Sequence, residues 1–176
     1  MCKNKTLFRN IVNKYHPDFK SKSILKQVEK HPLIFNIEHL IELTMAEVGG
    51  YEFVDADHCD FSDGTECKTG SIRQSLYGQR KNTYSLEISN IVSPGGNIKE
   101  GDVRVVIYNP HTDSQTYYYI PQEDLTKIGI NYHPTTGVGR IFASWNSKKN
   151  TIRKLDKYEV ESFEDLAKFK MLDLVA

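Results

Sequence analysis

The chain has 176 residues, 39% of them hydrophobic and 26% charged, which fits one globular domain spanning 1–176 with a single core. It has a polar start, no stretch near the roughly 20 apolar residues that a membrane span needs, and only 3 cysteines, none in CxxC spacing. These features argue against a bilayer segment, a signal peptide and a disulfide framework, and they predict a cytoplasmic protein.

The first elements along the chain are predicted to be helices. Apolar residues at helical spacing indicate a helical preamble over residues 1–35. A longer helix is expected over residues 37–48, where the apolar side chains fall on one face. Asn36 can cap its start, and Gly49-Gly50 is expected to end it.

The hydrophobic period changes after this helix. Residues 51–61 and 65–69 are predicted to be strands, joined by Ser62-Asp63-Gly64, whose glycine can take a positive φ. Residues 36–69 are therefore expected to form a helix followed by a catalytic β-hairpin.

Residues 70–176 are expected to complete the sheet and to add a final helix. That helix is predicted to begin at Ser162, with Asp165 three residues later as in a capping box. Four further strands are predicted, over residues 83–91, 103–108, 116–120 and 140–145. The expected fold class is α/β, with a mixed central sheet of about five strands flanked by helices.

The formal net charge is zero, but the charges are segregated along the chain. Between Asn36 and Glu66 there are nine acidic residues and no Lys or Arg. Two basic runs follow, namely Lys68, Arg73, Arg80 and Lys81, then Lys148, Lys149, Arg153, Lys154 and Lys157 with Asp156 among them. An acidic block beside basic ones suits a site that holds cations together with a polyanion.

Asp60, Glu66 and Lys68 are the candidate catalytic residues. Side chains two apart on a strand share a face, so Glu66 and Lys68 are expected to point the same way and Cys67 the other. A three-residue loop places Asp60 opposite Glu66. A two-residue turn instead brings Asp57 to this face, which leaves Asp57 as the alternative.

The same residues are candidate ligands of a divalent metal ion. Two adjacent carboxylates repel each other without a cation and supply the hard oxygen atoms that Mg²⁺ prefers. Asp60, Glu66 and the backbone carbonyl of Cys67 are therefore the candidate ligands. Lys68 is expected to stabilise the negative charge that develops on a phosphate. This chemistry suits hydrolysis of a phosphodiester bond.

Asp60 followed by Glu66-Cys67-Lys68 resembles the signature of the PD-(D/E)XK nuclease superfamily. The residues Asp60-Phe61, Gly64 and Glu66-Cys67-Lys68-Thr69 are most similar to the mismatch-repair nicking endonuclease and related restriction enzymes. The resemblance implies a restriction-endonuclease-like fold and cleavage of duplex DNA, restriction-like or nicking, with Mg²⁺ or Mn²⁺ as cofactor. It also implies a further acid from the preceding helix, where Glu47 lies. A palindromic target would imply a homodimer.

Two segments are candidates for contact with DNA. The first follows the catalytic strand and contains Arg73, Gln74, Arg80 and Lys81, which suit base edges. The second contains Lys148, Lys149, Arg153 and Lys154, which suit phosphates or else protect a solvated strand edge by their charge. Tyr117 to Tyr119 can help to read sequence or form an ordinary aromatic strand.

Several alternatives stay open. The enzyme could be a structure-specific repair or junction nuclease, or the chain could be a non-catalytic nucleic-acid-binding or inhibitory protein with a degenerate nuclease fold. The charged hairpin could be purely structural, since Asp-Gly is good turn chemistry. Pro17-Asp18 is an alternative metal ligand. Zinc at His58, Cys59 and Cys67, or a Cys67 thiol nucleophile, are further alternatives.

Overall fold

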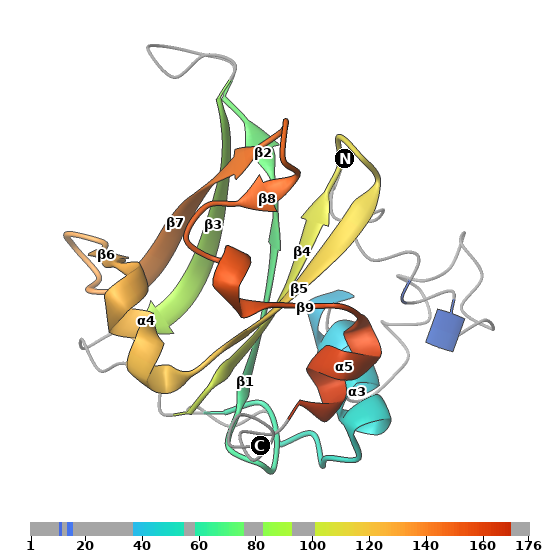
Figure 1. The fold of residues 1–176 in the computed structure, drawn as a ribbon. Helices are drawn as coiled ribbons and strands as arrows, with labels where there is room; N and C mark the ends of the chain where they lie inside the picture. The colour runs from blue at the N-terminus through green and yellow to red at the C-terminus, as the bar shows by residue number, and fades with distance from the viewer. Residues whose placement is uncertain are drawn as a thin grey trace.

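The computed structural model describes residues 11, 14–15, 37–54, 59–75, 83–92 and 101–169, and it shows a mixed α/β architecture (Figure 1). The α/β class is therefore confirmed. The strands form two sheets, however, where the sequence predicted one. No helix in the described part of the chain is long and apolar enough to cross a membrane.

The first sheet has four strands in the order β1-β4-β5-β9. The strand β1 pairs in parallel with β4, and the other pairs are antiparallel. The bounds of the strands are Glu66–Ser71 for β1, Val103–Asn109 for β4, Ser114–Ile120 for β5 and Glu159–Val160 for β9. Because β1 lies at the end of this order, one of its edges has no strand of the first sheet beside it.

The second sheet is antiparallel and has the order β2-β3-β7-β6, with β8 paired to β7. Its strands are β2 (Arg73–Gln74), β3 (Tyr84–Val92), β6 (Ile130–Tyr132), β7 (Gly139–Asn146) and β8 (Thr151–Ile152). The chain passes from the first sheet to the second at Ile72, between β1 and β2. One continuous extended segment therefore serves both sheets.

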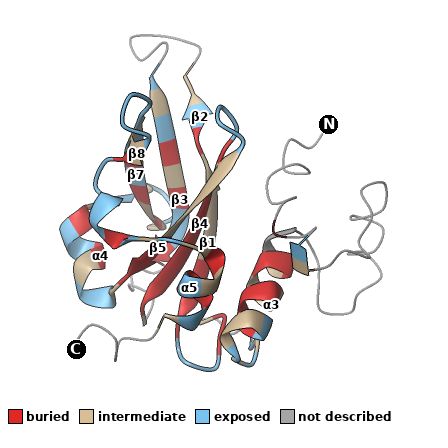
Figure 2. Ribbon diagram, turned by 45° about the vertical axis from the view of Figure 1, so that its right-hand side comes forward, coloured by how far each residue is buried: buried red, intermediate tan, exposed pale blue. Residues whose placement is uncertain are grey.

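The first sheet is buried on both faces. Helices α3 (Ile37–Gly49) and α5 (Phe163–Lys168) cover one face, and the second sheet covers the other. Figure 2 shows the buried residues concentrated on the inner strands and on the helix sides turned toward them. Only one residue of β4 is not buried, as a strand covered on both faces requires. Helix α4 (Gln122–Ile128) and the 3₁₀ helix η3 (Asp156–Tyr158) contribute Leu125 and Tyr158 to the core between the sheets.

The helix predictions are confirmed where the structure describes them. Helix α3 ends as expected, with Gly50 at a φ of +75°. Ser162 caps α5, because its side chain accepts a hydrogen bond of 3.0 Å from the backbone N–H of Asp165. Of the preamble, Ile11 and Tyr15 are helical and pack against the core beneath α3 and α5. The rest of 1–35, including Pro17-Asp18, lies outside the described residues.

The strands predicted over 83–91, 103–108, 116–120 and 140–145 are confirmed as β3, β4, β5 and β7. The strand predicted over 51–61 is wrong for its described part, which makes only an isolated antiparallel bridge between Phe53 and Phe61. The physical reason lies in the following turn, where the backbone N–H groups of Asp60 and Phe61 both donate to the carbonyl of Thr65. That arrangement replaces the regular ladder of a hairpin, and residues 55–58 lie outside the description.

Arg104 on β4 is a charged residue in the core, with 0% of its surface exposed. Its guanidinium donates to the carboxylate of Asp63 at 2.9 Å and to the hydroxyl of Tyr51 at 3.1 Å. It also donates to the backbone carbonyls of Leu166 at 3.1 Å and Phe169 at 3.0 Å. The buried charge is therefore both paired and hydrogen-bonded, the condition under which such burial is tolerated.

Replacing Arg104 with Met is expected to lower the free energy of unfolding by about 3–5 kcal/mol, because Asp63 then keeps a charge that has lost its partner. The measurement is urea unfolding followed by circular dichroism. Arg140→Met is the matched control, since the Arg140 to Glu87 pair of 2.9 Å lies at the surface and should contribute about 0–1 kcal/mol. Equal small losses in the two variants would contradict this role of Arg104.

Candidate functional site

The turn before β1 positions the candidate residues. The backbone N–H of Gly64 donates to the carbonyl of Phe61 at 2.9 Å, which closes a tight turn. Gly64 has a φ of +83°, the positive value that the sequence predicted. The carbonyl of Thr65 accepts from Asp60 at 3.1 Å and from Phe61 at 3.2 Å. These hydrogen bonds bring Asp60 back beside the start of β1.

The turn also packs tightly against the start of β4. Gly101 has a φ of +102°, and a Cβ atom there would lie 2.0 Å from the carbonyl oxygen of Gly64. Only glycine fits this close approach of two backbones. The next residue, Asp102, accepts a hydrogen bond of 2.9 Å from the backbone N–H of Glu66. The position of Glu66 is therefore set by β4 and that of Asp60 by the turn.

Asp60 is tied directly to the strand that carries the other two candidates. Its Oδ2 atom accepts a hydrogen bond of 2.7 Å from the backbone N–H of Cys67, and the residue is only 7% exposed. The N–H of Glu66 points to β4, so the N–H of Cys67, one residue later, points to the outer edge of β1. The carboxylate of Asp60 therefore lies at this edge, beside the peptide unit between Glu66 and Lys68.

Glu66 and Lys68 share the face of β1 that is turned toward the second sheet. The register pairs Glu66 with Val103 and Lys68 with Val105, and both valines belong to the core between the sheets. Glu66 is 1% exposed and its carboxylate forms an ion pair with Lys68, whose side chain is 16% exposed. Cys67 packs on the opposite face, in the core beneath the helices. This is the alternation that the sequence predicted.

Lys68 stays charged in this position. Burial opposes its charge, but the neighbouring carboxylates of Glu66 and Asp60 outweigh that effect and raise the pKa of Lys68 above its ordinary value. Lys68 is therefore an ammonium group at neutral pH. It can stabilise negative charge and donate hydrogen bonds, but it is not suited to accept a proton.

Cys67 has the properties of a core residue. Its complete burial, together with the charges of Glu42 and Asp60, holds the pKa of the Cys67 thiol well above its ordinary value. A neutral, inaccessible thiol does not fit the alternative of a thiol nucleophile. No group of three or more His, Cys, Asp or Glu side chains among the described residues could hold a metal ion, and His58 lies outside them.

Two acids of α3 lie in different environments. Glu47, the residue that the resemblance pointed to, is exposed on α3. Glu42 on the same helix is half-buried, and its charge reaches the Cys67 thiol. The sequence carried a signal for this, because Ala46 lies one helical turn after Glu42 and belongs to the buried face. Asp63 was also missed, since its ion pair with Arg104 depends on a distant strand.

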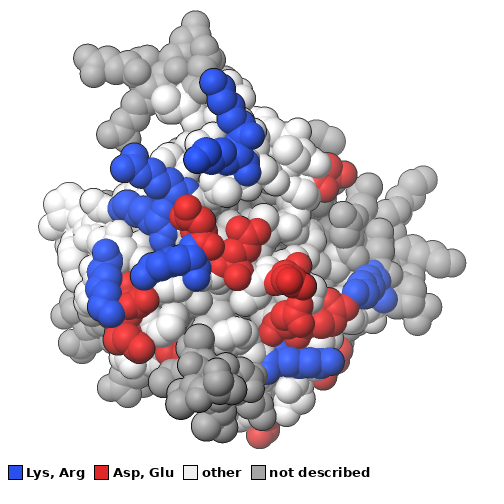
Figure 3. Space-filling view, in the orientation of Figure 1, with Lys and Arg blue, Asp and Glu red and all other residues white. Residues whose placement is uncertain are grey.

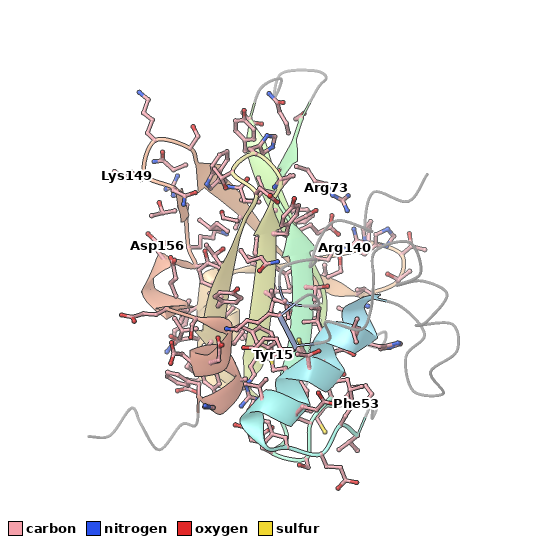
Figure 4. The ribbon with its side chains drawn as sticks, turned by 90° about the vertical axis from the view of Figure 1, so that its right-hand side faces the viewer. Tyr15, Phe53, Arg73, Arg140, Lys149 and Asp156 are labelled. Carbon is pink, nitrogen blue, oxygen red and sulfur yellow. The ribbon has the colours of Figure 1, made fainter. Side chains whose placement is uncertain are left out.

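The residues predicted to contact DNA belong to two segments, and the described ones lie in different places. Arg73 is exposed on β2, Gln74 is half-buried, and Arg80 and Lys81 lie outside the described residues, as does Asp57. Figure 4 shows Arg73 on one side of the two sheets and Lys149 on the other. Lys148, Lys149 and Arg153 line a hollow beside β8. The ammonium group of Lys154 instead lies near Gly129, and this residue is not part of the lining.

In comparisons with known proteins, no protein-family model matches this chain and no curated protein matches it. The site is therefore interpreted from its own residues. Its firm features are the hydrogen bond from Cys67 to Asp60, the buried ion pair of Glu66 and Lys68, and the turn that joins them.

The stability of the turn is expected to depend on acid pH through Asp63. Burial disfavours its charge, but hydrogen bonds from Thr65 and Arg104 outweigh burial and lower the pKa of Asp63 below its ordinary value. A carboxyl group whose pKa is lower in the folded state stabilises the fold above its unfolded pKa, and this stability is lost as the pH falls through the folded pKa. The stability advantage of the wild type over Asp63→Asn should therefore shrink as the pH is lowered through and below the ordinary pKa of an aspartate, in urea unfolding. A constant difference would contradict this.

Proposed function

We propose that this chain is a Mg²⁺-dependent DNA endonuclease of the PD-(D/E)XK type, in which Asp60, Glu66 and Lys68 are the catalytic residues. The observation that carries the proposal is the hydrogen bond between the Asp60 carboxylate and the backbone N–H of Cys67. This hydrogen bond holds the carboxylate of Asp60 beside β1, at the residue that lies between Glu66 and Lys68. This is the grouping that the sequence signature implies.

The burial of these charges supports a functional role. Asp60 and Glu66 are both buried, and Glu66 forms an ion pair with the largely buried Lys68. Keeping charged groups away from water is costly, and such groups concentrate at functional sites. A divalent cation bound by the two carboxylates would add to the favourable electrostatic interactions of these acids.

The oxygen atoms at this edge suit Mg²⁺. Asp60 supplies a carboxylate at the outer edge of β1, to which the carbonyl of Cys67 also points, and Glu66 supplies a second carboxylate on the adjoining face of the strand. Mg²⁺ commonly binds through one or two carboxylates and keeps several water molecules, so this set is sufficient. These residues would hold Mg²⁺ or the similarly hard Mn²⁺. When bound, the metal would neutralise charge on the phosphate and lower the pKa of a water molecule.

The residues of the chain have separate tasks in this proposal. The ammonium group of Lys68 stabilises the negative charge that develops on the phosphate during attack. In the metal-free chain, the carboxylates of Glu66 and Asp60 raise the pKa of Lys68 and favour its charged form. Asp60 is held in place by Cys67, so that its orientation does not depend on the substrate. Solvent and substrate would enter at Lys68, the most exposed of the three residues.

The proposal also includes the class of substrate. The resemblance of the hairpin motif favours a restriction-endonuclease-like fold and duplex DNA, cut at a preferred sequence by a restriction-like or nicking enzyme. Arg73 is exposed on β2, which continues from the catalytic strand, and it suits a guanine edge. A palindromic target would require a homodimer, whereas a structure-specific repair or junction nuclease would act without a preferred sequence.

One observation favours a competing function. Glu66 is almost fully buried and is paired with Lys68, as in a structural ion pair. A nucleic-acid-binding or inhibitory protein with a degenerate nuclease fold would have such a pair without catalysis. The two functions differ in whether DNA is cut, so a cleavage assay separates them.

Purified protein is expected to cut supercoiled and linear duplex DNA with Mg²⁺ and to leave both intact with a chelator. Lys68→Ala, Glu66→Gln and Asp60→Asn should each reduce the cleavage rate by about 100-fold or more, because each removes charge stabilisation at the reacting phosphate. Lys68→Ala should still bind DNA in a filter-binding assay. Glu123→Gln, an exposed acid of α4, is the control and should cut normally.

Binding without cutting under every metal condition would contradict the nuclease and favour the competing function. Discrete fragments from linear DNA would indicate sequence preference, whereas cutting only at branched or mismatched substrates would indicate a structure-specific enzyme. Glu42→Gln and Glu47→Gln in the same assay decide which acid of α3 acts at the site. The position of Glu42 near Cys67 favours the larger loss in Glu42→Gln.

A further inference from the structure

An aromatic cluster lies at the end of the sheets where β2 and β8 are found (Figure 1). The rings of His111 and Trp145 are nearly parallel, with 12° between their planes and 5.7 Å between their centroids. Tyr84 meets both rings edge-on, at 4.7 Å from His111 and 4.9 Å from Trp145. A centroid separation of 5.7 Å means that the two parallel rings do not cover each other fully. Trp145 is only half-buried and also lines the neighbouring hollow, so part of its surface can contact another planar group.

A basic hollow adjoins this cluster. It has a volume of about 510 Å³ and is lined by Trp145, Lys148, Lys149 and Arg153, with Asp156 as its acid. The lining also includes hydroxyl and amide groups, from Ser144, Asn146, Ser147 and Thr151. Figure 3 shows Lys and Arg side chains gathered over the upper part of this face. Because three basic residues and one acidic residue line the hollow, its net positive charge favours the binding of a polyanion.

The turn between β7 and β8 fixes the geometry of this surface. The Asn146 side chain accepts from the backbone N–H groups of Lys148 at 3.1 Å and Lys149 at 3.3 Å. Asn150 has a φ of +52°, and its side chain accepts a hydrogen bond of 3.2 Å from the indole N–H of Trp145. The indole plane is therefore held in one orientation, with both lysines displayed beside it. A site that is ordered before binding loses less entropy on binding.

We propose that this hollow binds a single-stranded nucleic acid, with phosphates on Lys148, Lys149 and Arg153 and an unpaired base against Trp145. The combination of a cationic groove and an aromatic ring is what such a strand recognises. Duplex DNA can satisfy the cations, but its bases are stacked on one another and are not available to the indole. An anionic lipid surface or a phosphorylated protein supplies charge without bases, so neither accounts for the aromatic cluster.

This inference goes beyond the proposed cleavage and does not depend on it. Trp145, Lys148 and Lys149 belong to the β7–β8 hairpin, whereas Asp60 and Glu66 lie at the start of β1, toward the opposite end of the molecule in Figure 1. Binding in the hollow needs no metal ion and no nucleophile. In a nuclease, the hollow would hold a strand that has been separated from its complement; in a non-catalytic protein, it would be the main binding surface.

The chain contains 1 tryptophan, so its intrinsic tryptophan fluorescence reports on Trp145 alone. The probe is an oligothymidylate of about 12 nucleotides, within the roughly 4–16 nucleotides that one such surface covers. The titration uses the full chain with a chelator, so that no cleavage occurs. Stacking of a base should quench the fluorescence in a saturable way. An abasic strand of equal length should bind about tenfold more weakly and cause no quenching, because it has phosphates without bases.

Lys149→Glu and Arg153→Glu should each weaken binding by about fivefold or more, measured by the anisotropy of a labelled strand. Lys168→Glu makes the same charge change on α5, away from the hollow, and is expected to leave binding unchanged. Circular dichroism checks that the variants fold. Equal binding of the abasic strand, stronger quenching of Trp145 by duplex DNA than by the single strand, absence of quenching, or an equal effect of Lys168→Glu would each overturn the proposal.

Discussion

The buried guanidinium of Arg104 is the interaction on which the site depends. It joins Asp63 in the turn, Tyr51 after α3, and the carbonyls of Leu166 and Phe169 at the end of α5. The rings of Tyr51, Phe61 and Tyr119 surround it at 4.8 to 5.6 Å, which adds cation–π attraction at a position that is fully buried. Three segments far apart in sequence are thus held at one point of β4. The turn that carries Asp60 is one of them.

The two edges of β1 position different residues of the site. One edge pairs in parallel with β4, which fixes the register of Glu66 and Lys68. The other edge receives the carboxylate of Asp60 on the backbone of Cys67. A backbone hydrogen bond of this kind constrains the orientation of the carboxylate. The arrangement therefore combines a rigid strand with an acid whose position is set by the backbone of that strand.

The charged groups at β1 and at the β7–β8 hairpin differ in their net sign and in their burial. At β1 the acids outnumber the lysine, and all three groups are largely removed from water. In the hollow the cations outnumber the acid and extend into solvent. In the functions proposed above, the first group would hold a small divalent ion and the second a flexible polyanion. The two groups lie in different parts of the folded chain, one buried and one exposed.

Local features of the fold could be predicted from the sequence. The periodic apolar face and Gly49-Gly50 predicted α3, and the capping pair of Ser162 and Asp165 predicted α5. The alternation of Glu66, Cys67 and Lys68 gave the correct faces of β1. Helix α4 was missed although it had signals, namely the acids Glu123 and Asp124 in its first turn and Gly129 at its end.

Features that depend on distant segments could not be predicted. The partners of Arg104 lie 41, 53, 62 and 65 residues away in sequence, so nothing local shows that this arginine is buried. The strands β2, β8 and β9 have two residues each, too few for a period of two to be visible. The sequence of β1 does not show that this strand pairs in parallel with β4, because its alternation of residues would be the same beside another strand.

The most direct test of the central claim is a titration of the ¹⁵N-labelled chain with Mg²⁺, followed through the backbone amide signals. If Asp60 and Glu66 hold the metal, the amides of Cys67 and Lys68 should shift in a saturable way, because the Cys67 N–H donates to Asp60. The shifts should disappear in Asp60→Asn. Saturable shifts confined to other segments, or equal shifts at Cys67 in Asp60→Asn, would contradict the metal site and the nuclease built on it.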